Sequence, residues 1–497
     1  MLSTFRLPLL AFLCLATLTA QSANDKLGWS RYLPAGGYDV ATKVLVEKSG
    51  DVWVAGYSYG KYEAYGPNEP FQLNNAGSSD IFLTKFRINP DGSSTVLFFT
   101  WLGGASTEEL VDMKFDNRGR IVLCGITNSN DFPIAGNPIQ NAAGGDYDVF
   151  VAIVDPNQGG KASLVYSTYY GGIGREQAKA IAVSPENNIA VVGNTTADDL
   201  PGVATGAQPN RRGNTDAFVI YFNPDQSATL KYASYFGGAG TDTAVAVAID
   251  RSNRIWFAGS TGSDDFPITS NGAKTSATGY LDGYVACFDP AVSGLNSFIY
   301  SSLIGGSKSD EARGVAVDAN GKVWVTGITF SEDFPVTANA AQSTLGGGTD
   351  LFLVQIDPLL EGDAALVYST FIGGTGYEFV YGFTQIDATR FALAGYSMTG
   401  LLPTTANAYG KLPSSGFAEG MIAVVNTALS GKPAVEYLSY FGGSSTDVIN
   451  SVAFDPTNAK SLFIAGYSTS IDLPTTDGTS RGNAPNAPNA FAAKLLR

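Results

Sequence analysis

Hydrophobic and polar residues alternate along the chain in short stretches, and each stretch ends in Gly, Pro, Asn or Asp. One set of four such stretches is "TAVAVAI" (243–249), "RIWFAGST" (254–261), "DGYVACF" (282–288) and "NSFIYSSLI" (296–304). Short segments that are rich in β-branched and aromatic residues and separated by turn residues are typical of β-strands. No segment has a convincing helical period, so the pattern predicts an all-β fold.

This set of four strands repeats along the chain. Related phrases are "YSTYYGGIGREQAKAIAV" from Tyr166, "YASYFGGAGTDTAVAVAI" from Tyr232 and "YSSLIGGSKSDEARGVAV" from Tyr300. Their Gly-Gly pairs recur every 66 to 69 residues and start at Gly103, Gly171, Gly237, Gly305, Gly373 and Gly442. A copy with Pro34-Ala35 in place of the glycines brings the number to seven. Seven such copies predict a seven-bladed β-propeller of four-stranded antiparallel blades.

The two ends of the chain are predicted to meet in one blade. The last copy stops after its third strand, in "FAAKLLR", and "GWSRYL" (28–33) aligns with the fourth strands of the other copies. This N-terminal strand should complete the last sheet and close the ring, which removes two open sheet edges. Residues 21–497 are therefore predicted to form a single propeller domain.

Each Gly-Gly pair is predicted to join two blades. The aromatic run before the pair is interpreted as an outer strand, and the Ala-rich run after it as the inner strand of the next blade. The glycines are expected to permit the sharp crossing between the two strands, and the small side chains suit the crowding near the axis.

Charge and composition narrow the classes of partner and chemistry. The net charge is -15 with a pI near 4.5, which argues against nucleic acid and anionic lipid and favours cations or neutral ligands. The chain has no histidine, which excludes His-dependent triads and His metal ligands. The phrase "GYSYG" (56–60) matches a nucleophile motif but lacks the helix and histidine that the motif requires.

The N-terminal stretch "MLSTFRLPLLAFLCLATLTAQSA" has one Arg, an apolar core and small residues after it. This pattern predicts a secretory signal peptide at residues 1–20, with a membrane anchor as the less favoured interpretation. We therefore expect a secreted or cell-surface protein, or a periplasmic one, with no transmembrane segment in the mature chain. Cys124 and Cys287 are expected to be buried free thiols, because they lie two repeats apart at different places in the repeat.

The repeat units also resemble a known family. The phrases "YSTYYGGIGREQAKAIAV" and "VWVTGITFSEDFPVTANAAQSTLGGGTDLFLVQIDP" are similar to the SBBP-type β-propeller repeats of bacterial exported and cell-surface proteins, over essentially all of the mature chain. The resemblance implies a seven-bladed propeller and an extracellular setting. It implies no catalytic residues, and the first and sixth copies depart from it in their "DFP" loops.

An acidic residue stands four positions after the second residue of every junction pair. These seven residues precede the inner strands at equivalent places and are expected to surround one mouth of the central channel: Asp39, Glu108, Glu176, Asp242, Asp310, Glu378 and Asp447. Each carboxylate either caps its own turn or lies free in solvent, or several converge on a polar ligand or on a cation such as Ca²⁺. No cofactor beyond Ca²⁺ is suggested.

Two more acidic series recur in most blades, which favours a role in turns over a role in binding. One opens the third strands: Asp80, Asp148, Asp216, Asp282, Asp350 and Glu419, with Asn489 in the last copy. The other lies in the "DFP" or "DLP" turns: Asp131, Asp199, Asp265, Asp333 and Asp472.

The first copy departs from the repeat in the long loop between its second and third strands. Aromatic residues gather there: Tyr57, Tyr59, Tyr62, Tyr65 and Phe71. These loops and the blade junctions should emerge on the same face. Exposed aromatic rings stack on sugars or anchor protein partners, so a glycan or protein is predicted to bind this face. Alternatively, the tyrosines pack the loop onto its neighbours.

The sequence thus predicts an exported, non-catalytic binding or scaffold module. The alternative is a carboxylate-based extracellular enzyme that acts on glycans, as a glycosidase or lyase. Two ring carboxylates about 5 to 10 Å apart in an open cleft would favour the enzyme. The enzyme would also require two acids in distinct environments, which equivalent repeats do not readily provide. A ring plugged by side chains, with each carboxylate bonded to its own turn, would favour the binding module.

Overall fold

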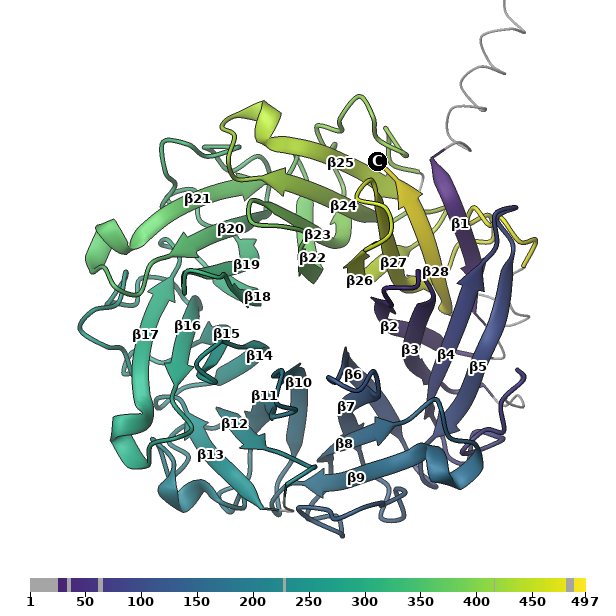
Figure 1. The fold of residues 1–497 in the computed structure, drawn as a ribbon. Coiled ribbons are helices and arrows are strands. Elements are labelled where there is room, and N and C mark those ends of the chain that lie inside the picture. The colour runs from purple at the N-terminus through teal and green to yellow at the C-terminus, as the bar shows by residue number, and fades with distance from the viewer. Residues whose placement is uncertain (1–25, 34–36, 61–65, 227–228, 415, 480–486) are drawn as a thin grey trace, which may run out of the picture.

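The predicted seven-bladed propeller is confirmed. In the described part of this computed structural model, the chain forms 28 strands in seven four-stranded antiparallel sheets, which stand as blades around a central axis (Figure 1). The predicted signal peptide, Pro34-Ala35, Tyr62 and Tyr65 lie outside the described residues. The structure describes residues 26–33, 37–60, 66–226, 229–414, 416–479 and 487–497.

Each blade contains an inner strand, two middle strands and an outer strand. The inner strands are β2 (Asp39–Val46), β6 (Glu108–Phe115), β10 (Glu176–Val183), β14 (Asp242–Ile249), β18 (Asp310–Val317), β22 (Tyr377–Gln385) and β26 (Asp447–Phe454). The second strands are β3 (Val52–Ser58), β7 (Ile121–Thr127), β11 (Ile189–Thr195), β15 (Ile255–Thr261), β19 (Val323–Thr329), β23 (Arg390–Met398) and β27 (Ser461–Ser468).

The remaining two positions complete each sheet. The third strands are β4 (Asp80–Ile88), β8 (Asp148–Val154), β12 (Asp216–Phe222), β16 (Asp282–Phe288), β20 (Asp350–Ile356), β24 (Ala418–Asn426) and β28 (Asn489–Leu496). The outer strands are β5 (Ser94–Leu102), β9 (Leu164–Tyr170), β13 (Leu230–Phe236), β17 (Phe298–Ile304), β21 (Leu366–Ile372), β25 (Val435–Phe441) and β1 (Leu27–Tyr32).

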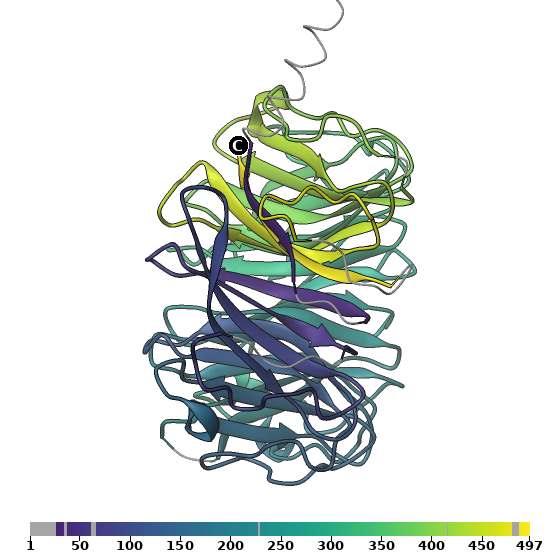
Figure 2. The ribbon, with the colours of Figure 1, turned by 90° about the vertical axis from the view of Figure 1, so that its right-hand side faces the viewer.

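The chain ends close the ring as predicted. β1 pairs antiparallel with β28 and becomes the outer strand of the seventh blade, whose order is β1-β28-β27-β26. The side view shows the purple β1 beside the yellow β28 (Figure 2). The first and last segments of the propeller are therefore joined by antiparallel strand pairing, with a register shift between Leu27 and Trp29.

The hydrophobic core lies between neighbouring blades. A typical cluster packs Val151 of β8 against Phe218 of β12 in the next blade, with both side chains fully buried. The last cluster joins the seventh blade to the first through Trp29 of β1, Phe82 and Trp101. Because every blade shares its core with two neighbours, closing the ring buries apolar surface that an open array would expose.

Short 3-10 helices precede several outer strands in the described residues. They are η1 (Gly160–Ser163), η3 (Gly294–Ser297), η4 (Gly362–Ala365) and η5 (Lys432–Ala434), and η2 (Val203–Thr205) lies in a long loop. The described chain contains no helix that is long and apolar enough to span a membrane. Cys124 and Cys287 are free and buried, as predicted.

Candidate functional site

The seven acidic residues that follow the junctions are buried at the start of the inner strands. In Glu176, Oε2 accepts the Gly172 N–H at 2.9 Å, and Oε1 accepts the Thr195 hydroxyl at 2.7 Å. Asp39 accepts the hydroxyl of Ser58. The other five accept the N–H of the second junction glycine: Gly104, Gly238, Gly306, Gly374 and Gly443. Six of the seven carboxylates therefore hold the turns of their junctions, and Asp39 is bonded to the end of the second strand of its own blade.

This arrangement sets the acidic residues back from the centre of the ring. None of the seven lines the central cavity, and their carboxylates accept hydrogen bonds from N–H groups of the junctions or from hydroxyl groups of the second strands. In the described residues, no group of three or more His, Cys, Asp or Glu side chains could hold a metal ion. A Ca²⁺ site in this ring stays a prediction.

The two other acidic series converge on the same junctions. Asp148 accepts the N–H groups of Gly144 and Gly145, and Asp199 accepts that of Ile173 at 2.9 Å. Asp199 belongs to the series in the "DFP" and "DLP" turns. The other four members of this series likewise accept the N–H of the residue that follows a glycine pair: Asp131, Asp265, Asp333 and Asp472. Both series form turns, in agreement with their repetition.

The junction glycines are required for a different reason than the sequence suggested. A Cβ on Gly171 would overlap carboxylate oxygens of both Asp148 and Glu176, and one on Gly172 would overlap Asp199. Neither glycine has a positive φ. The pair is therefore needed because carboxylates approach the backbone closely from several sides, and not because the chain adopts a left-handed conformation there.

Glu176 makes the stability of the fold depend on pH. Burial raises the pKa of Glu176 to about 7, from 4.5 for a free side chain. The folded state therefore holds the proton of Glu176 more tightly than the unfolded state does. The resulting contribution to the free energy of unfolding is fully present below pH 4.5 and is lost as the pH rises through 7. We expect wild type to lose up to about 3 kcal/mol relative to Glu176→Gln between pH 4.5 and 7.5. Urea unfolding of both proteins across this range measures the difference, and a difference that is constant or grows in the opposite direction would contradict the burial argument.

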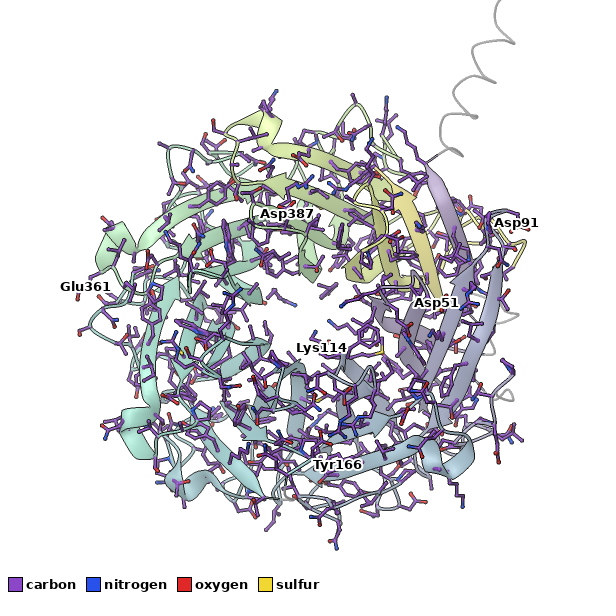
Figure 3. The ribbon with its side chains drawn as sticks, viewed as in Figure 1. Asp51, Asp91, Lys114, Tyr166, Glu361 and Asp387 are labelled. Atoms are coloured by element: carbon purple, nitrogen blue, oxygen red, sulfur yellow. The ribbon has the colours of Figure 1, made fainter. Side chains whose placement is uncertain are left out.

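A cavity of about 640 Å³ occupies the middle of the ring. The inner strands of all seven blades line it, and Figure 3 places Lys114 of β6 at the inner edge of the ring. This volume falls in the usual range for sites that bind small molecules. The cavity is therefore the best candidate for a functional site.

Seven β-bulges determine which side chains face this cavity. In every inner strand, the register with the second strand shifts at the third residue after the junction acid, and this residue is left unpaired. All seven unpaired residues line the cavity, and we call them the bulge ring: Thr42, Val111, Lys179, Val245, Arg313, Tyr381 and Asn450. Bulges commonly re-aim a side chain next to a binding site.

Tyrosines from the sixth, seventh and first blades form one side of the channel. Tyr38, Tyr57, Tyr381 and Tyr467 line the cavity. The ring of Tyr59 lies 5.6 Å from that of Tyr38 and 6.4 Å from that of Tyr57, between centroids. This places two of the predicted aromatic residues beside the channel.

The position of Tyr57 corrects the sequence analysis, which put this residue in the long loop. Strand β3 continues to Ser58, which pairs with Asp80, so Tyr57 lies within the sheet opposite Ile81. Tyr59 is 41% exposed and follows the strand directly. Phe71 is half-buried and packs against the core shared by the first two blades.

An ion-paired group occupies part of the channel wall. The Asp112 carboxylate lies 3.1 Å from Lys114 Nζ and 3.5 Å from Lys43 Nζ, and it accepts the Ile181 N–H at 3.1 Å. Burial acts to raise the pKa of Asp112, but Lys114 and Lys43 hold it below its usual value. This carboxylate therefore stays ionised and ties the first three blades together.

Lys179 and Arg313 of the bulge ring bring positive charge to the cavity. Lys179 makes no hydrogen bond or ion pair with any described residue. Burial, followed by the positive charges of Arg313 and Arg175, lowers the pKa of Lys179, while Glu109 acts in the opposite direction. The cavity is lined by four basic side chains against two acidic ones, although the whole chain carries a net charge of -15.

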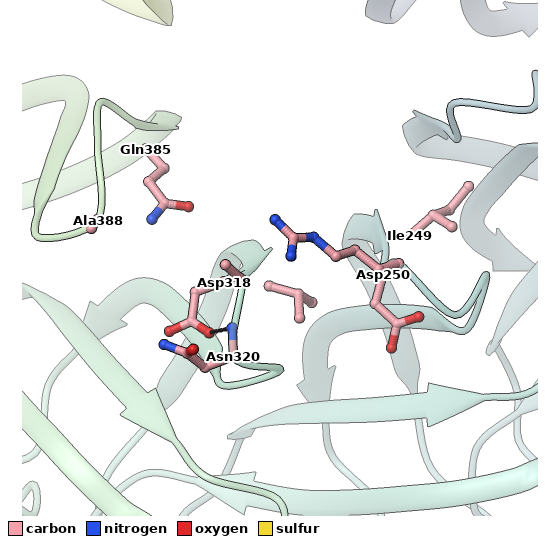
Figure 4. Close-up of a pocket in the computed structure, with 9 residues that line it drawn as sticks. Ile249, Asp250, Asp318, Asn320, Gln385 and Ala388 are labelled. Atoms are coloured by element: carbon pink, nitrogen blue, oxygen red, sulfur yellow. Dashed lines mark hydrogen bonds between the residues drawn. The ribbon is translucent and has the colours of Figure 1, made fainter.

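A second hollow of about 420 Å³ lies at the turns that follow three inner strands (Figure 4). Asp250 and Asp318 line it, and both carboxylates are engaged by their own turns. Asp318 accepts the Asn320 N–H at 2.8 Å, and Asp250 accepts the Ser252 N–H at 2.8 Å. This hollow offers fewer free polar groups than the channel does.

Sequence reasoning missed the bulge ring. A signal was present, because the position before each bulge is apolar in all seven blades while the bulge position itself varies. The apolar set is Ala41, Leu110, Ala178, Ala244, Ala312, Val380 and Ile449. The register shift that aims the variable residue into the channel could not be read from this pattern alone.

Comparisons with known proteins find similarity in structure alone. No protein-family model matches the chain, and no curated protein matches its sequence. A luciferin-regenerating enzyme matches at 8% identity and a TM-score of 0.33, over 94% of this chain and 95% of that one. An alpha-L-arabinofuranosidase from Fusarium graminearum, bound to an iminosugar inhibitor, matches at 10% and 0.36, over 95% and 98%. A mutant of a Synechocystis apocarotenoid oxygenase matches at 10% and 0.36, over 89% and 93%. Likenesses this distant carry no argument about function.

Proposed function

We propose that this protein is an exported, non-catalytic binding protein whose ligand occupies the central channel of the propeller. The main support for this proposal is the bulge ring. Seven equivalent positions face one cavity, and their side chains are Thr, Val, Lys, Val, Arg, Tyr and Asn. A ring with only a packing role would keep one chemical character, as the preceding position does, because it is apolar in all seven blades and alanine in four of them. Diversity at equivalent positions is what an asymmetric ligand requires.

The acidic residues support binding over catalysis. Glycoside hydrolysis by two carboxylates needs both groups free at the reacting bond. Two carboxylates line the cavity, those of Glu109 and Asp112. The Asp112 carboxylate is held by two lysines and by backbone N–H groups. This leaves Glu109 without a free partner acid among the described residues that line the cavity.

The extracellular setting is part of the same proposal. It rests on the predicted signal peptide and on the resemblance to SBBP-type repeats of exported and cell-surface proteins. The tyrosines beside the channel mouth suit a glycan, because an aromatic ring packs against the apolar face of a sugar.

Native gels that contain one polysaccharide each test this function. The chain from Gln21 is expected to be retarded by at least one glycan in a panel of neutral and acidic polysaccharides. The same mixtures should show no new reducing ends and no unsaturated products. Tyr381→Ala should lose the retardation, while Tyr280→Ala, which removes a 92% exposed tyrosine outside the channel, should keep it.

Two results would refute the proposed function. New reducing ends or unsaturated products would show a glycosidase or lyase. Mobility unchanged by every polysaccharide would show that the channel does not bind glycans.

A further inference from the structure

The channel wall combines three kinds of group in one cavity. Lys179 and Arg313 supply positive charge, Tyr381 supplies an aromatic face, and Asn450 supplies an amide. All four are bulge-ring residues, so a ligand in the channel meets them at one level of the ring. The chemistry of these four side chains indicates the class of ligand, which the proposed function leaves open.

The positive charge at Lys179 is poorly compensated by the protein itself. Its amine has no ion-pair partner among the described residues, and the charges of Arg313 and Arg175 outweigh that of Glu109 in their effect on its pKa. Lys179 and Arg313 are partly buried, and like charges that face one cavity favour an anion between them. The overall acidity of the chain therefore does not describe the field at this site.

Arg313 is oriented but keeps donors for a ligand. It forms an ion pair with Glu311, to which one of its N–H groups donates at 2.6 Å, and its guanidinium lies 5.8 Å from the centre of the Tyr381 ring. A guanidinium has five N–H donors, so most remain for the planar carboxylate that its shape suits. Tyr381 is 41% exposed, which leaves part of its ring free for contact.

Asn450 adds a site for hydroxyl groups. Its Nδ2 donates to the carbonyl of Ala41 at 3.0 Å, which fixes the side chain. The amide oxygen has no partner in the described part of the chain, so it is free to accept a hydrogen bond from a ligand hydroxyl.

We propose that the channel binds an acidic saccharide whose carboxylate contacts Lys179 and Arg313 and whose ring packs on Tyr381. This proposal rests on the proposed function and names its ligand class. A sugar acid carries an anionic group, hydroxyl groups and an apolar ring face in one residue. An acidic peptide carries the charge without that ring face at each acidic residue, so it matches only part of the wall.

Calorimetric titration of the chain from Gln21 tests the proposal with defined ligands. The probes are trimers of galacturonate and of mannuronate, the same trimers with their carboxyl groups reduced to alcohols, monomeric galacturonate and hexaglutamate. At least one uronate trimer should bind, and its reduced form should bind at least about tenfold more weakly. Binding of the acidic form should weaken as salt is added.

Variants assign the binding to the channel. Lys179→Met and Arg313→Met should each weaken binding of the acidic trimer at least about tenfold. Lys161→Met removes the same charge from an exposed position outside the channel and should bind as wild type does. Circular dichroism and urea unfolding show whether each variant is folded.

The unfavourable outcomes separate this inference from the proposed function. Equal binding of the acidic and reduced trimers would overturn carboxylate recognition and leave a glycan-binding channel. Binding of hexaglutamate without any trimer would overturn the ligand class. If no probe bound but a neutral polysaccharide still retarded the protein in the native gel, the inference of an acidic saccharide would be wrong and the proposed function would stand. The acidic trimer could also bind equally well to wild type and to the folded variants Lys179→Met and Arg313→Met. This result would show that the channel is not the binding site.

Discussion

Replacing Gly171 by alanine is expected to lower the free energy of unfolding by about 3 kcal/mol, because forcing extra volume into a packed site is destabilising. The new Cβ would overlap oxygens of Asp148 and Glu176, which are both buried and hydrogen-bonded to the backbone. Neither carboxylate can withdraw without leaving N–H groups unpaired, those of Gly144 and Gly145 for Asp148 and that of Gly172 for Glu176. Urea unfolding followed by circular dichroism measures the change.

Gly262→Ala is the matched control. Its Cβ would lie 3.6 Å from the nearest atom, the Thr241 carbonyl oxygen, which is an ordinary contact. This variant is expected to unfold within about 1 kcal/mol of wild type. If Gly171→Ala were as stable as Gly262→Ala, the close approach of carboxylates would not be the reason for the junction glycines.

Trp29→Ala is expected to cost about 3 to 5 kcal/mol, which is typical of a large aromatic side chain removed from a core. Trp29 belongs to β1, is fully buried, and packs in the cluster that joins the seventh blade to the first. Its ring lies 5.8 Å from that of Phe86 in the first blade. The loss should therefore weaken the point at which the ring closes.

Val367→Ala in the outer strand of the fifth blade provides the comparison. Val367 is 36% exposed, and its loss should cost about 1 kcal/mol or less. Both variants are compared by their urea midpoints and by limited proteolysis near the N-terminus. A Trp29→Ala protein that matched Val367→Ala in both assays would show that the closure by β1 does not contribute to the stability of the ring.

The fold could be predicted because the pattern of each strand occurs in seven copies along the chain. The segment "DGYVACF" coincides with β16, and the closing strand was placed from its likeness to other fourth strands. Errors arise at strand ends. The segment "NSFIYSSLI" begins two residues too early, since Asn296 and Ser297 lie in η3 rather than in β17. A single turn of 3-10 helix leaves no periodic signal in so short a segment.

The candidate site was harder to predict than the fold. The spacing of the acidic residues showed that they are equivalent, but only the structure shows that Glu176 turns toward the Gly172 N–H and away from the axis. The side chain of Lys179 reaches the channel through a one-residue shift in register, and hydrophobic alternation does not encode such a shift. The proposed binding residues lie where equivalent positions of the repeat differ.

A crystal structure of the chain from Gln21 with a bound uronate trimer tests the central claim most directly. We expect the saccharide in the central channel, with a carboxylate at hydrogen-bond distance from Lys179 or Arg313 and a sugar ring against Tyr381. A trimer bound on the outer strands or between two neighbouring blades, with the channel free of saccharide, would show that the channel is not the binding site.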